Sequence, residues 1–500
     1  MSLNFSKCVT YNLENGKIEK TKLRSDGEFK EELSRYYDNY KIVMPNVKEG
    51  SIIEYKYTIT SPFINRIPRW NFQSTVPVNY SEYVTKIPEY YVFNVHNKGY
   101  LTPTVSSEIK NKEFSEMYQE RYGTGGAGRP LNHERGTYSL KYTEKVTKYI
   151  VNNAKPIKDE DFVGNVDNYI SSVDYELVST RYPNQPFKNY ATNWNDVVKD
   201  IYENEDFGGQ LKGNDFLKST LDEILGGSIS QDEKISKIYG YIYNNISWNG
   251  YNGYFADKGI KKALKEKSGN VADINLLLVA MLREASVEAN PMILSTRSNG
   301  IALFPSRKAF NYVVCAIETN NGLILIDASD KKSSPNMLPI KCLNWDGRIV
   351  RKDGTSISIS LRPNSSSTLN RTLMATIDEN GTINGKIREQ YFDYYNYIYL
   401  NDNKNKKDEE IITDKEKSCN DAEIENYSKK EDNKTNSITE SYSFTSQNTI
   451  DIISGKMYLK PLLFFGTKEN PFKEETREYP IDFTFAKQNK FNIHLVHVIL

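Results

Sequence analysis

The segment VADINLLLVAMLREA at residues 271–285 is the most apolar helix candidate in the chain. Its hydrophobic residues surround the helix axis instead of following one stripe, which is typical of a helix buried on all sides. The hydrophobic fraction of the whole chain, 38%, is low but sufficient for folding. We therefore expect a central helix at 271–285, covered by other elements of one domain.

The length of 500 residues is too great for a single hydrophobic core and predicts two to four domains of roughly 100–200 residues each. Lys+Arg and Asp+Glu balance at 65 each, so no net charge attracts nucleic acid or anionic lipid, and we exclude nucleic-acid binding. No stretch approaches the roughly 20 apolar residues of a transmembrane helix. The first residues, MSLNFSKCVTYNL, contain no apolar run of the kind that forms the centre of a signal peptide.

The first third of the chain has the pattern of β-structure. Asn15-Gly16 lies between two short polar-apolar segments in 5–24, which predicts a hairpin because both residues tolerate positive φ. Residues 53–59 alternate apolar side chains (Ile53, Tyr55, Tyr57, Ile59) with polar ones, which predicts a strand with one buried face. The 36 tyrosines favour strand-rich structure, because the ring covers a half-buried sheet while the hydroxyl stays hydrated.

The middle of the chain changes to a helical pattern. We expect helices between 159 and 225 and an amphipathic helix at 231–246, where isoleucines recur on one face. The helix at 271–285 is followed by two strand-like runs, which span 291–295 and 310–318. The second run continues through Asn320-Asn321-Gly322 into 323–326. This order predicts an α+β domain.

From about residue 365 the pattern is again that of β-structure, with a second hairpin turning at Asn380-Gly381. Residues 401–435 are rich in Lys, Glu, Asp and Asn, and we interpret this charged excursion as a solvated helix or a mobile segment. The run from Gly123 to Gly128 fits a dinucleotide-binding spacing, but no buried strand precedes it, so we interpret it as a loop.

Neither cysteines nor histidines indicate a metal site. Cys8, Cys315, Cys342 and Cys419 are scattered, without the close pairs of a zinc site or a disulfide framework. The four histidines, at 96, 133, 494 and 497, lack ligand spacing with acidic neighbours. We therefore expect no metal and no cofactor.

One set of positions has the order of a cysteine-hydrolase site. Gly269-Asn270-Val271-Ala272-Asp273 runs directly into the apolar helix, Tyr312 opens the next strand run, and Asp327 closes the hairpin fifteen residues later. A thiol at a helix N-terminus, an imidazole on a neighbouring strand and a carboxylate that orients the imidazole form the catalytic triad of papain-type enzymes.

This arrangement resembles the transglutaminase-like core, in the form that occurs in envelope or secreted proteins of Bacteroidota-like bacteria. In that form the core stands between β domains of unknown function numbered 3857 and 3858. The segments KIVMPNVKEGSIIEYKYTITSPF and FQSTVPVNYSEYVTKIPEYY resemble the N-terminal domain, and KENPFKEETREYPIDF resembles the C-terminal one.

The resemblance implies a multidomain α+β protein. We expect an N-terminal β-sandwich-like domain at 1–160, a central transglutaminase-like (papain-type) α+β core with a preceding helical segment at 161–350, and a C-terminal β domain, truncated relative to the family, at 351–500. It also implies a periplasmic or cell-surface location.

The sequence departs from the active pattern at two of the three catalytic positions. Val271 stands where the resemblance places the nucleophilic cysteine, and Tyr312 stands where it places the histidine, so only Asp327 remains. No cysteine lies at the helix start, and no histidine occurs between His133 and His494. A shift of the alignment therefore does not restore the pair.

We hypothesise a catalytically inactive protein that binds a peptide or glycan in the degenerate groove, or that acts as a scaffold. The alternative is an active cysteine-type peptidase or acyl transferase on peptide or isopeptide bonds. The residues predicted to edge the groove are Trp248, Asn270, Asp273 and Asn311. For Asp273, and for Asn275 two residues later, we favour capping or bracing of the helix over ligand contact. For Trp248 the alternative role is core packing.

Overall fold

The computed structural model describes residues 1–497 apart from 35–36, 65–66, 123–131, 191–192, 228–229, 433–434, 468 and 474. The glycine-rich run at 123–128 lies outside the described residues. The chain divides into two compact units, the first formed by Met1–Arg69 with Phe93–His96 and Asp174–Leu177, and the second by the rest. The domain boundaries at 160 and 350 stay a prediction.

The first unit contains an antiparallel sheet with the strand order β2-β1-β5. The predicted hairpin at Asn15-Gly16 is confirmed, because both residues have positive φ, 50° and 77°, between β1 and β2. A separate hairpin joins β3 and β4. The strands are β1 (Ser2–Glu14), β2 (Lys17–Lys22), β3 (Glu28–Ser34), β4 (Tyr37–Ile42) and β5 (Ile52–Thr60).

The buried face predicted for β5 is wrong. Ile53, Tyr55, Tyr57 and Ile59 do share one face of the strand, but their exposed fractions lie between 44% and 57%. Alternation along a strand determines which side chains point the same way. Burial requires in addition a second layer packed on that face, which the pattern of one strand does not reveal.

The second unit begins with β-structure in which the two longest strands form an antiparallel hairpin, within the strand order β7-β10-β9. The strands are β6 (Trp70–Asn71), β7 (Val78–Pro88), β8 (Tyr91–Lys98), β9 (Thr104–Tyr122), β10 (Asn132–Ala154), β11 (Ser172–Thr180) and β12 (Lys188–Asn189), of which β8 and β11 also contribute residues to the first unit.

The helical pattern predicted for 159–225 is wrong for part of that range. Residues 172–180 form β11, whose side chains alternate between buried and half-buried along SVDYELVST. Valine and tyrosine at alternate positions, Val173 and Tyr175, favour a strand, and the helical pattern starts only at α1. Helices do follow from there, at α1 (Trp194–Tyr202) and α2 (Lys218–Leu225).

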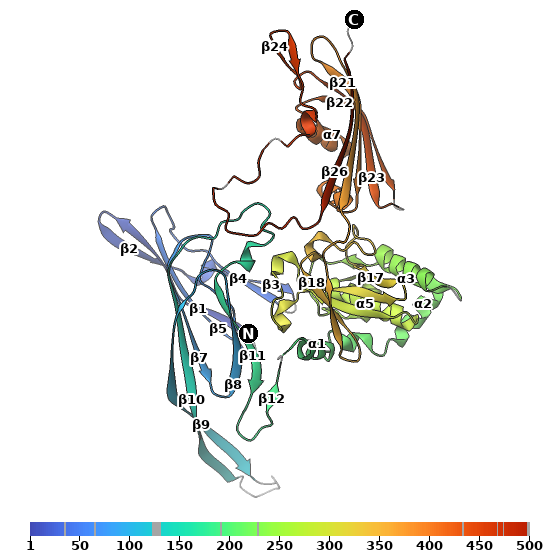
Figure 1. Cartoon of the computed structure of the whole chain (residues 1–500). Helices are drawn as coiled ribbons and strands as arrows, with labels where there is room; N and C mark the ends of the chain where they lie inside the picture. Colours follow the sequence, from blue (N-terminus) through green and yellow to red (C-terminus); the bar gives the residue numbers. More distant parts are fainter. Residues whose placement is uncertain are drawn as a thin grey trace. The chain divides into compact units, whose positions relative to one another are not determined.

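The α+β core of the second unit is built around α5 (Val271–Glu284), which confirms the central helix expected at 271–285. Every residue of α5 from Val271 to Leu282 is buried. The helix packs between the sheet strands β15 and β16 on one side and helices α3 and α4 on the other (Figure 1). The helices are α3 (Gln231–Asn245) and α4 (Ile260–Glu266), and α3 confirms the amphipathic helix expected at 231–246.

The sheet of this core has five antiparallel strands in the order β17-β16-β15-β18-β19. Its strands are β15 (Ala289–Leu294), β16 (Tyr312–Thr319), β17 (Gly322–Ile326), β18 (Asp346–Val350) and β19 (Ser356–Ser360). A short parallel pair, β13 (Ser247–Trp248) with β14 (Ser268–Gly269), leads into α5. Strands β16 and β17 form the hairpin that carries Tyr312 and ends next to Asp327.

The last part of the second unit is a five-stranded sheet in the order β22-β23-β21-β20-β26, with β20 and β26 parallel. The elements are β20 (Ser367–Ile377), β21 (Ile383–Phe392), α6 (Tyr394–Asp402), α7 (Asp408–Ser418), β22 (Glu423–Asp432), β23 (Ser437–Ser446), β24 (Asp451–Ile453), β25 (Lys456–Tyr458) and β26 (Lys487–His497). The hairpin predicted at Asn380-Gly381 is confirmed between β20 and β21.

The interpretation of 401–435 as a wholly solvated helix or mobile segment is wrong for β22, which is an edge strand of this sheet. Most of its side chains are exposed, and charged side chains commonly protect an edge strand from pairing with other chains. The charged composition of this segment therefore led to a wrong prediction for the residues that form β22. Among the described residues, no helix has both the length and the apolar character needed to cross a membrane.

Candidate functional site

The N-terminus of α5 is fixed by a reciprocal pair of hydrogen bonds. Oδ1 of Asn270 accepts from the backbone N–H of Asp273 at 2.7 Å, and Oδ2 of Asp273 accepts from the N–H of Asn270 at 3.0 Å. This capping box satisfies two amides that have no partner inside the helix. The first helical residue is Val271, which is fully buried. A valine thus occupies the position at which a helix N-terminus would activate a thiol.

The same two residues hold the loop that precedes α4. Oδ1 of Asp273 accepts from the backbone N–H groups of Lys258 and Gly259 at 3.2 Å and 2.9 Å, and the side-chain amide of Asn270 donates to the carbonyl of Phe255 at 2.9 Å. Burial raises the pKa of Asp273, and these backbone donors oppose the rise. Both side chains therefore cap the helix and brace a loop.

Tyr312 and Asp327 meet beside α5. The hydroxyl of Tyr312, the first residue of β16, donates to Oδ2 of Asp327 at 2.7 Å and lies 3.2 Å from the hydroxyl of Ser329. Oδ1 of Asp327 accepts from the backbone N–H and the hydroxyl of Ser329 at 2.8 Å and 2.6 Å. All three side chains are buried. The carboxylate is thus satisfied by neutral donors alone.

Asn275 joins α5 to this pair. Its side-chain amide donates to Oδ1 of Asp327 at 2.9 Å and to the carbonyl of Val313 at 3.0 Å, and its own oxygen accepts from the N–H of Ala328 at 2.9 Å. The side chain is fully buried. One residue of the helix therefore joins β16 to the segment that follows β17, which is the bracing role that the sequence predicted for Asn275.

The electrostatics of the pair favour a neutral tyrosine. Burial raises the pKa of Tyr312 well above its ordinary value, and the adjacent carboxylate of Asp327 raises it further. Its hydroxyl therefore stays protonated at neutral pH and acts as a hydrogen-bond donor. Asp327 forms no ion pair with any described residue.

Two buried thiols lie in the same core. Burial raises the pKa of Cys315 and of Cys342, and for Cys342 the negative charge of Asp327 adds to the rise. Both side chains have no exposed surface. A thiol that is protonated and inaccessible does not act as a nucleophile at neutral pH.

The predicted groove residues differ in their exposure and in the partners of their side chains. The side chain of Asn311 makes two hydrogen bonds to Thr296. Its oxygen accepts from the backbone N–H of Thr296, and its amide donates to the Thr296 hydroxyl, both at 2.8 Å. Trp248 lies opposite Gly269 in the β13–β14 pair and keeps 39% of its surface exposed, with its indole N–H donating to the carbonyl of Tyr251 at 2.8 Å. Of the four residues, Trp248 is the one with a large exposed surface.

A residue that the sequence did not indicate completes this region. The ammonium of Lys341 lies 4.4 Å from the ring centre of Trp248 and 4.7 Å from that of Tyr312. Nothing in the sequence distinguishes Lys341 from the nearby Lys331 and Lys332, because a single lysine in a loop matches no motif. Only the fold brings it to the aromatic pair.

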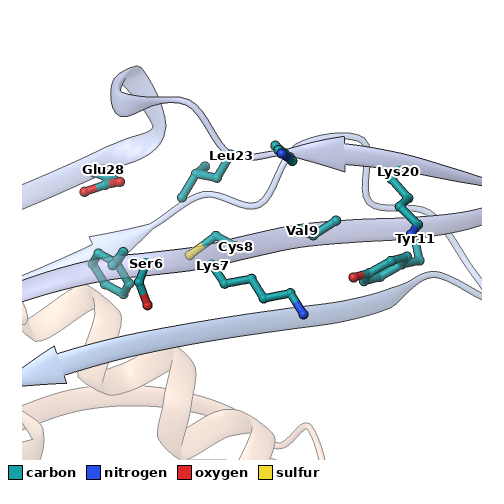
Figure 2. A pocket seen from close by; sticks show the side chains of 10 residues that line it. Ser6, Lys7, Cys8, Val9, Tyr11, Lys20, Leu23 and Glu28 are labelled. Atoms are coloured by element: carbon teal, nitrogen blue, oxygen red, sulfur yellow. The ribbon is translucent and has the colours of Figure 1, made fainter.

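The first unit has a separate surface hollow of about 460 Å³. It is bordered by β1, β2 and the segment leading into β3 (Figure 2), and its lining residues are Phe5, Ser6, Lys7, Cys8, Val9, Tyr11, Lys20, Lys22, Leu23 and Glu28. Glu54, on β5, forms an ion pair with Lys7 and accepts a hydrogen bond of 2.7 Å from the Tyr11 hydroxyl. Burial raises the pKa of Cys8, so the hollow offers no activated thiol.

No three His, Cys, Asp or Glu side chains gather as a metal site in the part of the chain that the structure describes. The arrangement around Tyr312 and Asp327 is thus a buried hydrogen-bond network of neutral donors and one carboxylate. Chemically it can position side chains and hold the hairpin on α5, and it contains no nucleophile–base pair.

Comparison with known proteins identifies two domains by family. Residues 2–118 match the family described as a domain of unknown function with a solved structure (DUF3857), and residues 218–317 match the transglutaminase-like superfamily. The second match includes Val271 and Tyr312. No curated protein matches this sequence. The resemblance of the C-terminal part to domain 3858 stays a prediction.

Two solved structures are similar to this chain. A proposed protease from Parabacteroides distasonis is 12% identical with a TM-score of 0.50, over 93% of this chain and 85% of that one. A proposed cysteine protease from Cytophaga hutchinsonii is also 12% identical, over 56% of this chain and 88% of that one, but its TM-score of 0.21 supports no inference. The first similarity shows a shared fold. The chain therefore carries a transglutaminase-like domain, preceded by a DUF3857 domain and flanked by β-rich structure.

Proposed function

We propose that this protein is a catalytically inactive transglutaminase-like protein whose former reaction centre has become a packed part of the core. The observation that carries the proposal is the hydrogen bond of 2.7 Å from Tyr312 to Asp327, beside a fully buried Val271. On this account the protein catalyses no reaction. It binds a peptide or glycan, or serves as a scaffold for its β-rich domains.

The side chains at the two altered positions support this proposal. A papain-type reaction needs a thiolate that attacks and an imidazole that accepts its proton. Valine has no nucleophilic atom. Tyr312, whose pKa is raised by burial, keeps its proton at neutral pH and points it at Asp327. Losing both groups removes the covalent mechanism instead of slowing it.

The competing function is an active cysteine-type peptidase or acyl transferase, which needs another thiol. The purified chain tests this directly on a peptide and on an isopeptide substrate, with and without iodoacetamide. We expect no product above the enzyme-free blank. Robust product formation that iodoacetamide abolishes would overturn the proposal, and Cys315 and Cys342 would be the first residues to examine.

The double substitution Val271→Cys with Tyr312→His tests whether the scaffold still aligns a triad. A thiol at the start of α5 benefits from the positive end of the helix, and an imidazole at position 312 would lie next to Asp327. Because position 271 is fully buried, we expect this thiol to stay unreactive toward iodoacetamide in the folded protein. A reaction whose apparent pKa lies below the ordinary value of about 8.5 would show instead that the scaffold still aligns a triad. The single variant Val271→Cys is the matched control, because it lacks the base.

We propose further that the protein acts in the periplasm or at the cell surface. Support comes from the resemblance to envelope proteins described above. Fractionation of the source cells checks this location, and recovery of the protein in the cytosolic fraction alone would contradict it.

A further inference from the structure

The rings of Trp248 and Tyr312 both lie close to one positive charge. The Lys341 ammonium lies 4.4 Å from the centre of one ring and 4.7 Å from the centre of the other. The side-chain oxygen of Asn252 accepts from the same nitrogen at 3.5 Å. We call this arrangement the ammonium slot. Two rings within about 6 Å of one cation is the geometry of an aromatic cage.

The walls of the slot are held in place without Lys341. Trp248 is fixed by the β13–β14 pairing and by its indole N–H, which donates to Tyr251. Tyr312 is fixed by its hydrogen bond to Asp327. A site whose walls are already ordered loses little conformational entropy when a ligand enters. The slot is thus preorganised for a cation, and Lys341 is its present occupant.

The charge behind the inner wall favours a cation. Tyr312 donates its phenolic proton to Asp327, a buried carboxylate without an ion pair among the described residues. A carboxylate behind the phenol adds negative potential to the ring face on which the ammonium lies. The outer wall, Trp248, is 39% exposed, so this ring can be reached from solvent.

We propose that the ammonium slot is a binding site for the ammonium group of a flexible chain, such as the lysine side chain of a peptide, and that Lys341 occupies it in cis. This inference deepens the proposed non-catalytic binding role and rests on it. Lys341 sits on a short turn, Ile340–Cys342, closed by a bond of 2.8 Å from the N–H of Cys342 to the carbonyl of Pro339.

The intramolecular occupant sets the apparent affinity of any external amine. A tethered group competes at an effective concentration that reaches the millimolar range. An external amine therefore binds weakly to the unaltered protein and more tightly once Lys341 is removed. Lys341 acts as a plug that keeps Tyr312 covered until a stronger ammonium ligand displaces it.

Calorimetric titration with Nα-acetyl-lysine methylamide tests the slot in the full-length chain. We expect the variant Lys341→Ala to bind this amine at least about tenfold more tightly than the unaltered protein, because the tethered competitor has been removed. The neutral analogue Nα-acetyl-norleucine methylamide should not bind. Adding Trp248→Leu to Lys341→Ala should abolish binding, and Lys352→Ala, a matched loss of one exposed lysine, should change nothing.

Equal binding of the neutral analogue, or no gain in Lys341→Ala, would overturn the inference. Lysine acetylation of the unaltered protein tests it without a variant. Tetramethylammonium should displace Lys341 and speed its acetylation relative to Lys352, whereas sodium at equal ionic strength should not. Equal rates with both salts would contradict the slot. Such a failure leaves the proposed inactivity untouched, because inactivity is measured by product formation.

Discussion

The hydroxyl of Tyr312 donates a hydrogen bond of 2.7 Å to Asp327, on the turn that follows the neighbouring strand, and both side chains are buried. In the family pattern an imidazole would make this contact and would exchange protons with a thiol. Here Tyr312 bonds to the carboxylate only, because Val271 has no thiol with which the residue at position 312 could exchange a proton. The geometry of a catalytic pair thus persists as a structural bond.

Removing only the Tyr312 hydroxyl tests that structural role. In Tyr312→Phe, Oδ2 of the buried Asp327 carboxylate loses its donor, and we expect a loss of about 1–3 kcal/mol in the free energy of unfolding. Urea denaturation followed by tryptophan fluorescence measures the change. Tyr395→Phe is the matched control, because that hydroxyl bonds to Asn489 at an exposed site and should cost less than about 0.5 kcal/mol. Equal effects of the two variants would contradict the prediction.

Asn270 distinguishes helix capping from ligand contact. In Asn270→Ala the N–H of Asp273 and the carbonyl of Phe255 both lose their partners, and we expect a loss of stability of about 1–2 kcal/mol. Binding of an amine in the Lys341→Ala background should not change. A variant that keeps its stability and loses binding would show instead that Asn270 is a groove residue.

The C-terminal sheet contains a buried charge cluster that predicts acid sensitivity. Burial opposes ionisation of Glu389, but Lys415 and Arg371, at 2.6 Å and 2.7 Å, outweigh it and lower the pKa of Glu389 to about 2. The folded-state pKa is thus below the unfolded-state value of about 4.3. The stabilisation is therefore present above pH 4.3 and is lost as the pH falls from about 4.3 through 2, by about 3 kcal/mol.

Hydrogen-exchange protection of β21 and β23, measured from pH 6 to pH 2.5, follows this loss locally. Glu389→Gln should remove most of the pH dependence, whereas Glu425→Gln, on the exposed side of β22, should retain it. Protection in the unaltered chain that does not change down to pH 2.5 would contradict the role of Glu389.

Local patterns predicted the elements that depend on local chemistry. The run at 271–285 forms α5. The Asn-Gly pairs at 15–16 and 380–381 form turns in which Asn15, Gly16 and Gly381 adopt positive φ at low cost. The spacing between Tyr312 and Asp327 predicted a pair across two strands, and the structure places the two side chains in contact.

Features that depend on tertiary contacts were not predictable in the same way. The apolar face of β5 is exposed. This was not predictable, because the pattern of one strand does not show whether another layer packs on it. The charge run around 423–432 forms an edge strand, where charge and strand structure are compatible. Lys341 reaches Trp248 and Tyr312 only because the turn Ile340–Cys342 is folded beside them. Ser329, two residues beyond Asp327, likewise matched no motif.

Native-state alkylation tests the absence of a reactive nucleophile most directly. The folded chain is treated with iodoacetamide near neutral pH, and the modified cysteines are identified by mass spectrometry. Cys315 and Cys342 are fully buried with raised pKa values, so we predict that neither reacts until the protein is unfolded in urea. Rapid, stoichiometric modification of either one in the folded protein would contradict the account, because it would reveal an accessible thiolate in this core.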